Sequence, residues 1–139
     1  MTTICYKAGI IAYDSRATLG GTIISDSVNK HGKRGGAHFF MVGSVADFEG
    51  FMQAYLSKET PGKHIDIMAF VVTDGVVYRV GADKGELWTQ KAYVVDAIGS
   101  GQSFAWGAMD AGCSAKEAVK IAAGRDTGTG GRIRMFRVK

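Results

Sequence analysis

Hydrophobic and polar residues alternate in short runs along the first third of the chain, a pattern typical of β-strands. The alternation predicts a hairpin whose strands are Thr2–Tyr6 and Gly9–Tyr13, joined by a tight turn at Lys7-Ala8. Three further strands are predicted over Thr22–Ser25, Val28–His31 and Ala37–Val42, the last two separated by a Gly-Lys-Arg-Gly-Gly loop.

The pattern then changes to a helical period. Ser44 is a suitable N-cap, and Asp47 in the first turn would complement the helix dipole. The apolar residues of this helix recur every three or four positions: Val45, Phe48, Met52, Tyr55 and Leu56. The helix is expected to end before Pro61-Gly62.

The remaining chain predicts more strands and then two helices. Strands are expected over Ile65–Thr73, Val76–Val80 and Glu86–Tyr93, with a hairpin turn at Asp74-Gly75. A helix is then expected over Ser103–Ala111. A second helix begins at Ser114, which forms a capping box with Glu117, and runs to about Gly124. A final strand is expected over Gly131–Val138. This order indicates an α+β layered fold, which we interpret as a single domain over residues 1–139.

Composition favours a globular protein. Hydrophobic residues make up 46% of the chain and charged residues 22%, and the apolar runs are too short for a spanning helix. The start of the sequence lacks the pattern of a secretory signal, and Cys5 and Cys113 have no metal-type spacing. We therefore expect reduced thiols in a cytoplasmic protein. The net charge of +4 is spread along the chain, so neither nucleic acid nor membrane is an expected partner.

Four features carry candidate chemistry. Removal of Met1 would leave Thr2 with a free α-amine, which can act as a general base for its own hydroxyl. Asp14 closes the first hairpin and could hold Lys30, sixteen residues further on, in its charged form beside a hydroxyl. Gly43 lies where strand meets helix, so a substrate could approach its backbone N–H. The polar loop 125–131 could hydrogen-bond an amine.

In this order, these motifs resemble those of proteasome β subunits. The chain has Thr-Thr at its start, Asp-x-Arg-Ala-Thr, a downstream lysine, Gly-Ser-x-Ala-Asp, Gly-Ser-Gly-x-x-Phe-Ala-x-Gly and Arg-Asp-x-x-Thr-Gly-Gly. It is also similar to the peptidase of the bacterial two-component ATP-dependent protease. The resemblance runs from Thr2 to about Val138 and implies a four-layer αββα sandwich of the N-terminal-nucleophile hydrolase type.

The resemblance also implies a threonine-type peptidase that hydrolyses peptide bonds without a metal or an organic cofactor. Its residues match the family position by position: Thr2 the nucleophile, Asp14 and Lys30 the charged pair, Arg16 a supporting residue, Gly43 the oxyanion donor, and Asp126 and Thr129 the residues that orient the amine. The specificity pocket falls on Ala17, Val28, Met41 and Val45, whose apolar character predicts hydrophobic residues before the cut.

The chain departs from the family pattern in three places. The first hairpin is about four residues shorter, an even number that preserves which side chains face inward. Gln102 replaces a residue that helps to hold the amine, a role that Ser100 or Ser103 could take over. After Lys58 the family's second long helix is missing and the last two helices are short. The helical layer is therefore reduced, and a homo-oligomer could be a ring, a spiral or a smaller assembly.

Alternatives to this reading remain open. The chain could be an N-terminal-nucleophile amidohydrolase that acts on a small amide, or a non-catalytic subunit of a proteasome-like assembly. Protein or peptide substrates and an ATP-dependent unfoldase are expected partners of the peptidase. Phosphate binding by Gly128–Gly131 or Gly99–Gly101 is a weaker hypothesis, because neither segment follows a strand and opens a helix with the full phosphate-loop pattern.

Overall fold

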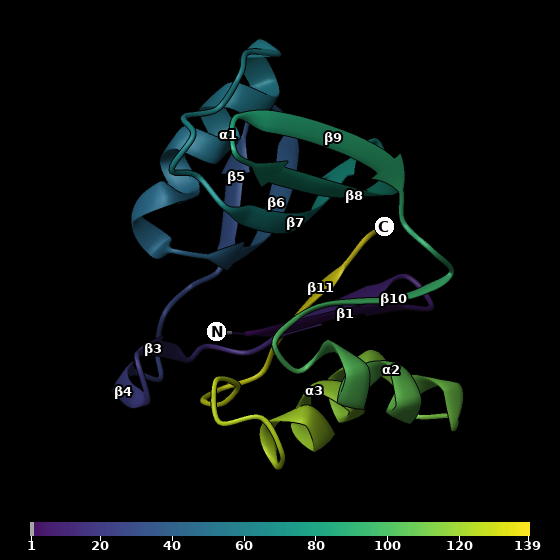
Figure 1. Ribbon diagram of the computed structural model, residues 1–139. Coiled ribbons are helices and arrows are strands. Elements are labelled where there is room, and N and C mark those ends of the chain that lie inside the picture. Colours follow the sequence, from purple (N-terminus) through teal and green to yellow (C-terminus); the bar gives the residue numbers. More distant parts are fainter. Residues whose placement is uncertain (1) are drawn as a thin grey trace. The chain divides into compact units, whose positions relative to one another are not determined.

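The computed structural model describes residues 2–139 and divides into two compact units (Figure 1). The first unit runs to Lys30 and resumes at Tyr93, and the second is His31–Ala92. Both units combine antiparallel strands with helices, so the predicted α+β class is confirmed. The single domain over residues 1–139 stays a prediction, and the expected loss of Met1 lies outside the described residues.

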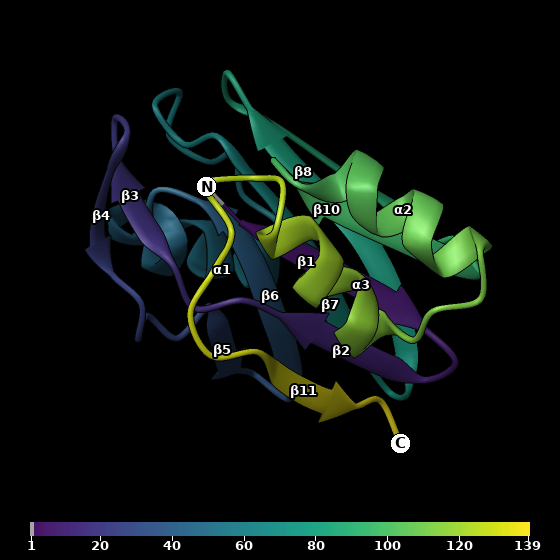
Figure 2. The same ribbon diagram turned by 90° about the horizontal axis from the view of Figure 1, so that it is seen from below.

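A four-stranded antiparallel sheet forms the core of the first unit. Its strand order is β10-β1-β2-β11, with β10 over Val95–Gly99, β1 over Thr3–Lys7, β2 over Ile10–Tyr13 and β11 over Arg134–Arg137. The helices α2 (Gln102–Asp110) and α3 (Ala115–Ala123) cover one face of this sheet (Figures 1 and 2). That face carries small side chains, Cys5, Ala12 and Ala97, which let the helices pack closely.

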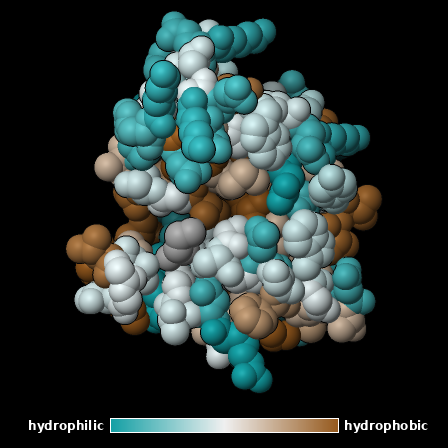
Figure 3. All heavy atoms as spheres, viewed as in Figure 1, coloured by the Kyte–Doolittle hydropathy of each residue, from teal (hydrophilic) through white to brown (hydrophobic). Residues whose placement is uncertain are grey.

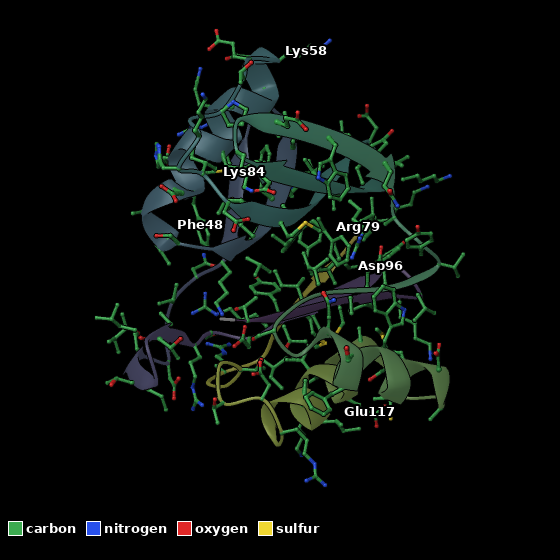
Figure 4. All side chains as sticks on the ribbon, in the orientation of Figure 1. Phe48, Lys58, Arg79, Lys84, Asp96 and Glu117 are labelled. Carbon is green, nitrogen blue, oxygen red and sulfur yellow. The ribbon has the colours of Figure 1, made fainter. Side chains whose placement is uncertain are left out.

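The helix pair is held by polar contacts at its ends. The Lys7 ammonium donates to the carbonyls of Met109 (3.0 Å) and Cys113 (2.8 Å), where the dipole of α2 is negative. At the start of α3, Ser114 and Glu117 form the predicted capping box, with Glu117 on the helix surface (Figure 4). The predicted limits of both helices are correct to within one residue.

The first hairpin forms, but its turn lies one residue later than predicted. Lys7 pairs with Ile10, so the turn residues are Ala8 (φ 51°) and Gly9 (φ 75°). Two successive positive φ angles define a type I′ turn, which matches the twist of the strands. Alanine rarely adopts a positive φ, so the residue types around Ala8 do not indicate the exact position of this turn.

The second unit is a five-stranded antiparallel sheet with one helix against it (Figure 1). The strands follow one another in the order β5 (His31–Arg34), β6 (Ala37–Gly43), β7 (Ile67–Thr73), β8 (Val76–Asp83) and β9 (Glu86–Lys91). The helix α1 (Phe48–Ser57) packs Phe48, Phe51 and Met52 against this sheet. Lys58 ends α1 with φ 55°, at the opposite end of the helix from Phe48 (Figure 4).

Three sequence predictions in this part of the chain are wrong. Val28 to Lys30 are irregular, and the strand predicted over Val28–His31 starts only at His31. Gly32 to Arg34 belong to β5 rather than to a loop, because Gly35 and Gly36 form the turn. Val45, predicted on the apolar face of the helix, lies half-exposed in a 3-10 turn, η1 (Val45–Asp47), ahead of α1.

The strand β10 was not predicted. Asp96 interrupts the apolar pattern of this strand, yet the residue is fully buried. Its burial is possible because the Asp96 carboxylate accepts hydrogen bonds from the N–H groups of Tyr93 and Ala97. Within the described residues, no helix lies between Lys58 and β7, as the sequence predicts. None of the helices found in residues 2–139 has the length and apolarity needed to cross a membrane.

Candidate active site

The N-terminal end of β1, the loop after β2 and the segment before β5 bring three predicted residues together. The Thr2 hydroxyl donates to Asp14 Oδ1 at 2.6 Å, and the Lys30 ammonium donates to the same oxygen at 2.6 Å. One carboxylate oxygen therefore bridges the hydroxyl and the ammonium. The three side chains are almost entirely excluded from solvent, with exposed fractions of 2%, 0% and 4%.

Backbone N–H groups fix the Asp14 carboxylate. Its Oδ2 atom accepts from Gly130 N (2.9 Å) and Arg16 N (3.4 Å), and Oδ1 also accepts from Thr3 N (3.4 Å). Gly130 belongs to the loop between α3 and β11, so distant parts of the chain converge on one carboxylate. A buried charge that is paired and hydrogen-bonded in this way is held in a defined position.

Burial changes the acidity of the ionisable groups around this site. Desolvation lowers the pKa of Lys30 below its ordinary value, and the Asp14 charge only partly opposes that effect. Burial, with a smaller contribution from the Asp14 charge, raises the pKa of the nearby Cys5 thiol to about 12. Cys5 therefore stays protonated near neutral pH and does not compete as a nucleophile.

A second hydrogen-bonded chain surrounds the backbone nitrogen of Thr2. That nitrogen donates to Ser100 Oγ at 3.2 Å, and Ser100 Oγ donates to Asp126 Oδ2 at 2.5 Å. The nitrogen therefore reaches Asp126 through Ser100. Of the two serines expected to compensate for Gln102, the structure places Ser100 in this position.

Asp126 also collects hydrogen bonds from its own loop. Thr129 Oγ1 donates to Asp126 Oδ2 at 2.6 Å and shares a 2.7 Å hydrogen bond with Thr3 Oγ1. Burial alone would raise the pKa of Asp126, but the hydrogen bonds from Ser100, Thr129 and Gly128 N outweigh it and lower the pKa. Asp126 is thus kept as a carboxylate beside the Thr2 nitrogen.

Arg16 supports the site from the side. Its guanidinium makes two hydrogen bonds to Asp26, at 2.8 and 3.2 Å, and a third to the carbonyl of Thr127. The guanidinium lies so close to Gly130 that a Cβ atom there would be 2.3 Å from Arg16 Cζ. Arg16 therefore links the segment after Asp14 to the loop that supplies the Gly130 N–H.

Gly43, the predicted oxyanion donor, ends β6 in the second unit with φ 139°. A Cβ atom on this residue would lie 2.6 Å from the carbonyl oxygen of Asp66 and 2.6 Å from Ile67 Cδ1. This backbone conformation and this crowding both require glycine. Gly43 is nevertheless exposed to solvent.

We predict that Gly43→Ala lowers the free energy of unfolding by about 1–3 kcal/mol, because alanine is strained at this φ angle. Urea unfolding would measure the change. Ser44→Ala is the matched control, since Ser44 is exposed and, among the described residues, makes no side-chain capping bond. We expect it to change stability by less than about 0.5 kcal/mol. Equal stability of Gly43→Ala and the wild type would contradict the conformational requirement.

The four predicted specificity residues are divided between the units. In the first unit, Ala17 is the first residue of β3 (Ala17–Leu19), and Val28 follows β4 (Thr22–Ser25), the strand with which β3 forms a hairpin. Met41 is buried in the core of the second unit and Val45 is half-exposed there. Their grouping into one pocket stays a prediction. A cavity of about 590 Å³ in the second unit, between the end of α1 and β9, contains none of the predicted site residues.

Sequence reasoning gave no individual role to four contributors to the site, although two of them belong to the predicted polar loop 125–131: Thr3, Asp26, Thr127 and Gly130. Thr127 and Gly130 contribute a backbone carbonyl and a backbone N–H, which residue type does not reveal. Asp26 had a sequence signal, because it and Arg16 bracket a short segment free of charged residues.

The fold is similar to that of BPH from Thiobacillus denitrificans in two solved structures. The structure in complex with epoxomicin is 21% identical, covers 97% of this chain and 96% of that chain, and has a TM-score of 0.67. A second structure of BPH is 20% identical to this chain, and the match covers 97% of this chain and 95% of that chain. Its TM-score is also 0.67. No protein-family model and no curated protein matches the sequence. The structural likeness supports the proteasome-like fold that the motifs imply.

Proposed function

We propose that this chain is a threonine-type peptidase in which Thr2 is the N-terminal nucleophile. One observation supports the proposal most directly. A buried oxygen of Asp14 accepts hydrogen bonds from both the Thr2 hydroxyl and the Lys30 ammonium. The proposal includes the four-layer αββα arrangement, a cytoplasmic location, peptide or protein substrates, and an assembly of several copies.

The proposed reaction is a two-step acyl transfer. Once Met1 is removed, the Thr2 amine accepts the hydroxyl proton and Oγ1 bonds to the carbonyl carbon of a peptide. The C–N bond then breaks, and the departing amine takes the proton. Water activated by the same amine hydrolyses the ester on Thr2 and releases the second fragment.

Each neighbouring residue has a role in this proposal. The Lys30 charge stabilises the developing alkoxide, and Asp14 positions Lys30. Ser100 and Asp126 orient the amine, and Thr129 supports Asp126. The N–H of Gly43 is assigned to the oxyanion through the family resemblance.

Intact-mass measurement before and after exposure to epoxomicin tests the proposal. The epoxyketone group of epoxomicin offers a ketone carbon to the Thr2 hydroxyl and an epoxide carbon to the adjacent Thr2 amine. A free N-terminal threonine therefore forms a ring with the inhibitor, and no atoms are lost. We expect the chain to lack Met1 and to gain one full inhibitor mass on Thr2. A form with extra residues before Met1, so that no amine is liberated on Thr2, is the control and should gain no mass.

The alternatives predict different outcomes in this experiment. A chain that has lost Met1 and gains no mass would be a non-catalytic subunit. A chain that is labelled but hydrolyses only simple amides, and no peptide, would be a small-amide hydrolase. Faster cleavage after charged residues than after Leu or Phe would overturn the predicted hydrophobic specificity.

A further inference from the structure

The Thr3 side chain is a buried polar group to which the proposed reaction gives no role. Burial in this chain does not follow hydrophobicity alone. Apolar side chains gather at the surface on the left margin of Figure 3, where the β3–β4 hairpin lies in the same view of Figure 1. Thr3, at the start of β1, is instead fully excluded from solvent. A hydroxyl buried to this extent needs a hydrogen-bond partner within the protein.

The partner of Thr3 is the hydroxyl of Thr129, which is also fully buried. The two Oγ1 atoms lie 2.7 Å apart. A hydroxyl has a single proton, and Thr129 directs its proton to Asp126 Oδ2 at 2.6 Å, because a carboxylate can only accept. The Thr129 oxygen is therefore the acceptor of the other bond, and the Thr3 hydroxyl is its donor.

Ser100 meets the Asp126 carboxylate from the other side. Ser100 Oγ lies 2.5 Å from Asp126 Oδ2 and 3.3 Å from the carbonyl oxygen of Thr2, so its single proton belongs to the shorter, charge-assisted bond. The Ser100 oxygen is then the acceptor for the Thr2 nitrogen, at 3.2 Å. Two hydroxyl protons thus converge on one carboxylate oxygen. The hydrogen bonds that begin at the Thr2 nitrogen therefore end at the hydroxyl of Thr3, the next residue in the chain.

The backbone of Gly101 lies directly against these two hydroxyls. A Cβ atom on Gly101 would be 2.1 Å from Thr3 Oγ1 and 3.2 Å from Thr129 Oγ1. Any side chain at residue 101 would therefore displace the Thr3 hydroxyl, which gives a reason for the second glycine of the Gly-Ser-Gly motif. Because both oxygens belong to fully buried residues, neither hydroxyl can exchange its partner for bulk solvent.

We propose that Thr3 is a positioning residue for the Thr2 amine and that it acts through Thr129. This inference rests on the proposed function of Thr2. By donating to Thr129, the Thr3 hydroxyl strengthens the bond from Thr129 to Asp126, since hydrogen bonds in a chain polarise one another. Asp126 is thereby held in place, and Ser100 is held between the carboxylate and the amine. Without that donor, the Thr129 oxygen has lost a partner in the core, and Asp126 is fixed less firmly.

The rate at which epoxomicin labels Thr2, followed by intact mass, tests this role. Thr3→Val removes the hydroxyl and keeps a branched side chain. We expect it to slow labelling about 3–10-fold, the effect of losing one hydrogen bond of ordinary strength. Thr3→Ser keeps the hydroxyl and loses only the methyl group, so it should be labelled at close to the wild-type rate.

The controls separate the hydroxyl from the packing around it. Thr73→Val is the matched control, because Thr73 is a half-buried threonine on a strand of the second unit, and it should leave the rate unchanged. Thr3→Ala also lacks the hydroxyl and replaces Thr3→Val if that variant does not fold, as judged by circular dichroism. A folded variant that lacks the hydroxyl and is labelled as fast as the wild type would refute the inference, and so would Thr3→Ser that is labelled as slowly as Thr3→Val.

A double-mutant cycle tests whether Thr3 acts through Thr129. In a Thr129→Val background the Thr3 hydroxyl has lost its acceptor, so adding Thr3→Val should slow labelling no further. Two losses that multiply in the double variant would show that Thr3 acts on Thr2 by another route, against the proposal. A wild type that has lost Met1 and gains no mass would refute the proposed function, and this inference with it. A labelled wild type with an unaffected Thr3→Val would refute the inference alone.

Discussion

Replacement of Asp14 by alanine is expected to lower the free energy of unfolding by about 3–5 kcal/mol, because it leaves the Lys30 charge buried without its partner. The same change removes the acceptor of three backbone N–H groups and of the Thr2 hydroxyl. Urea unfolding would measure the loss. Asp26→Asn, which also removes a carboxylate from an ion pair, is the matched control, and its much more exposed position predicts a far smaller loss.

The double variant Asp14→Asn/Lys30→Met separates stability from reactivity. Asparagine keeps an acceptor for the N–H groups, and methionine removes the charge that needed a partner. Replacing a buried ion pair with neutral side chains is often neutral or stabilising, so most of the lost stability should return. Labelling of Thr2 by epoxomicin should not return. If the double variant were as unstable as Asp14→Ala, the cost would come from the altered packing rather than from the unpaired charge.

Turn chemistry explains which strands could be predicted. Asp74-Gly75 is a common type I′ pair and was placed correctly, whereas Ala8 adopts a positive φ that its residue type does not indicate. Asp96 concealed β10, since a buried carboxylate within a strand breaks the apolar alternation. Local sequence patterns therefore identified the strands whose turn residues and buried faces follow the usual preferences of their residue types. They failed where a hydrogen bond stabilises a residue in a place that its type does not favour.

The candidate site shows a similar division. Thr2, Asp14 and Lys30 were predicted from the order of the family motifs, and the structure brings them together. The donors from the Gly130 backbone were not predictable, because a backbone N–H is present at almost every residue. Ser100 and Ser103 were both candidates to contact the Thr2 nitrogen, and the three-dimensional structure shows that Ser100 makes this contact.

Replacement of Lys30 by methionine is expected to slow the labelling of Thr2 by about 10²–10³-fold, similar to the loss of one oxyanion donor. The charge on Lys30 also predicts a pH dependence. In the wild type, labelling should rise as the Thr2 amine loses its proton, near pH 7.7–8.0 for an ordinary α-amine. It should fall again at alkaline pH when Lys30 loses its own proton, below the ordinary lysine pKa of 10.5 because burial lowers it.

Stability should change in the opposite direction over that alkaline range. The folded-state pKa of Lys30 is lowered, so between that pKa and 10.5 the unfolded chain binds more protons than the folded one. The contribution of Lys30 to the free energy of unfolding therefore rises with pH, and is smallest below the folded pKa. The difference in unfolding free energy between the wild type and Lys30→Met, measured at several pH values, isolates this contribution.

Lys30→Arg provides the control for the alkaline fall in labelling, because a guanidinium keeps its charge throughout this range. We expect the variant to retain the rise with the amine and to lose the fall at high pH. Loss of the positive charge at residue 30 would then account for the fall in labelling at high pH. Unfolding would not account for it, because deprotonation of Lys30 favours the folded chain. An alkaline limb that persists unchanged in Lys30→Arg would show that the ammonium takes no part in activating the Thr2 hydroxyl.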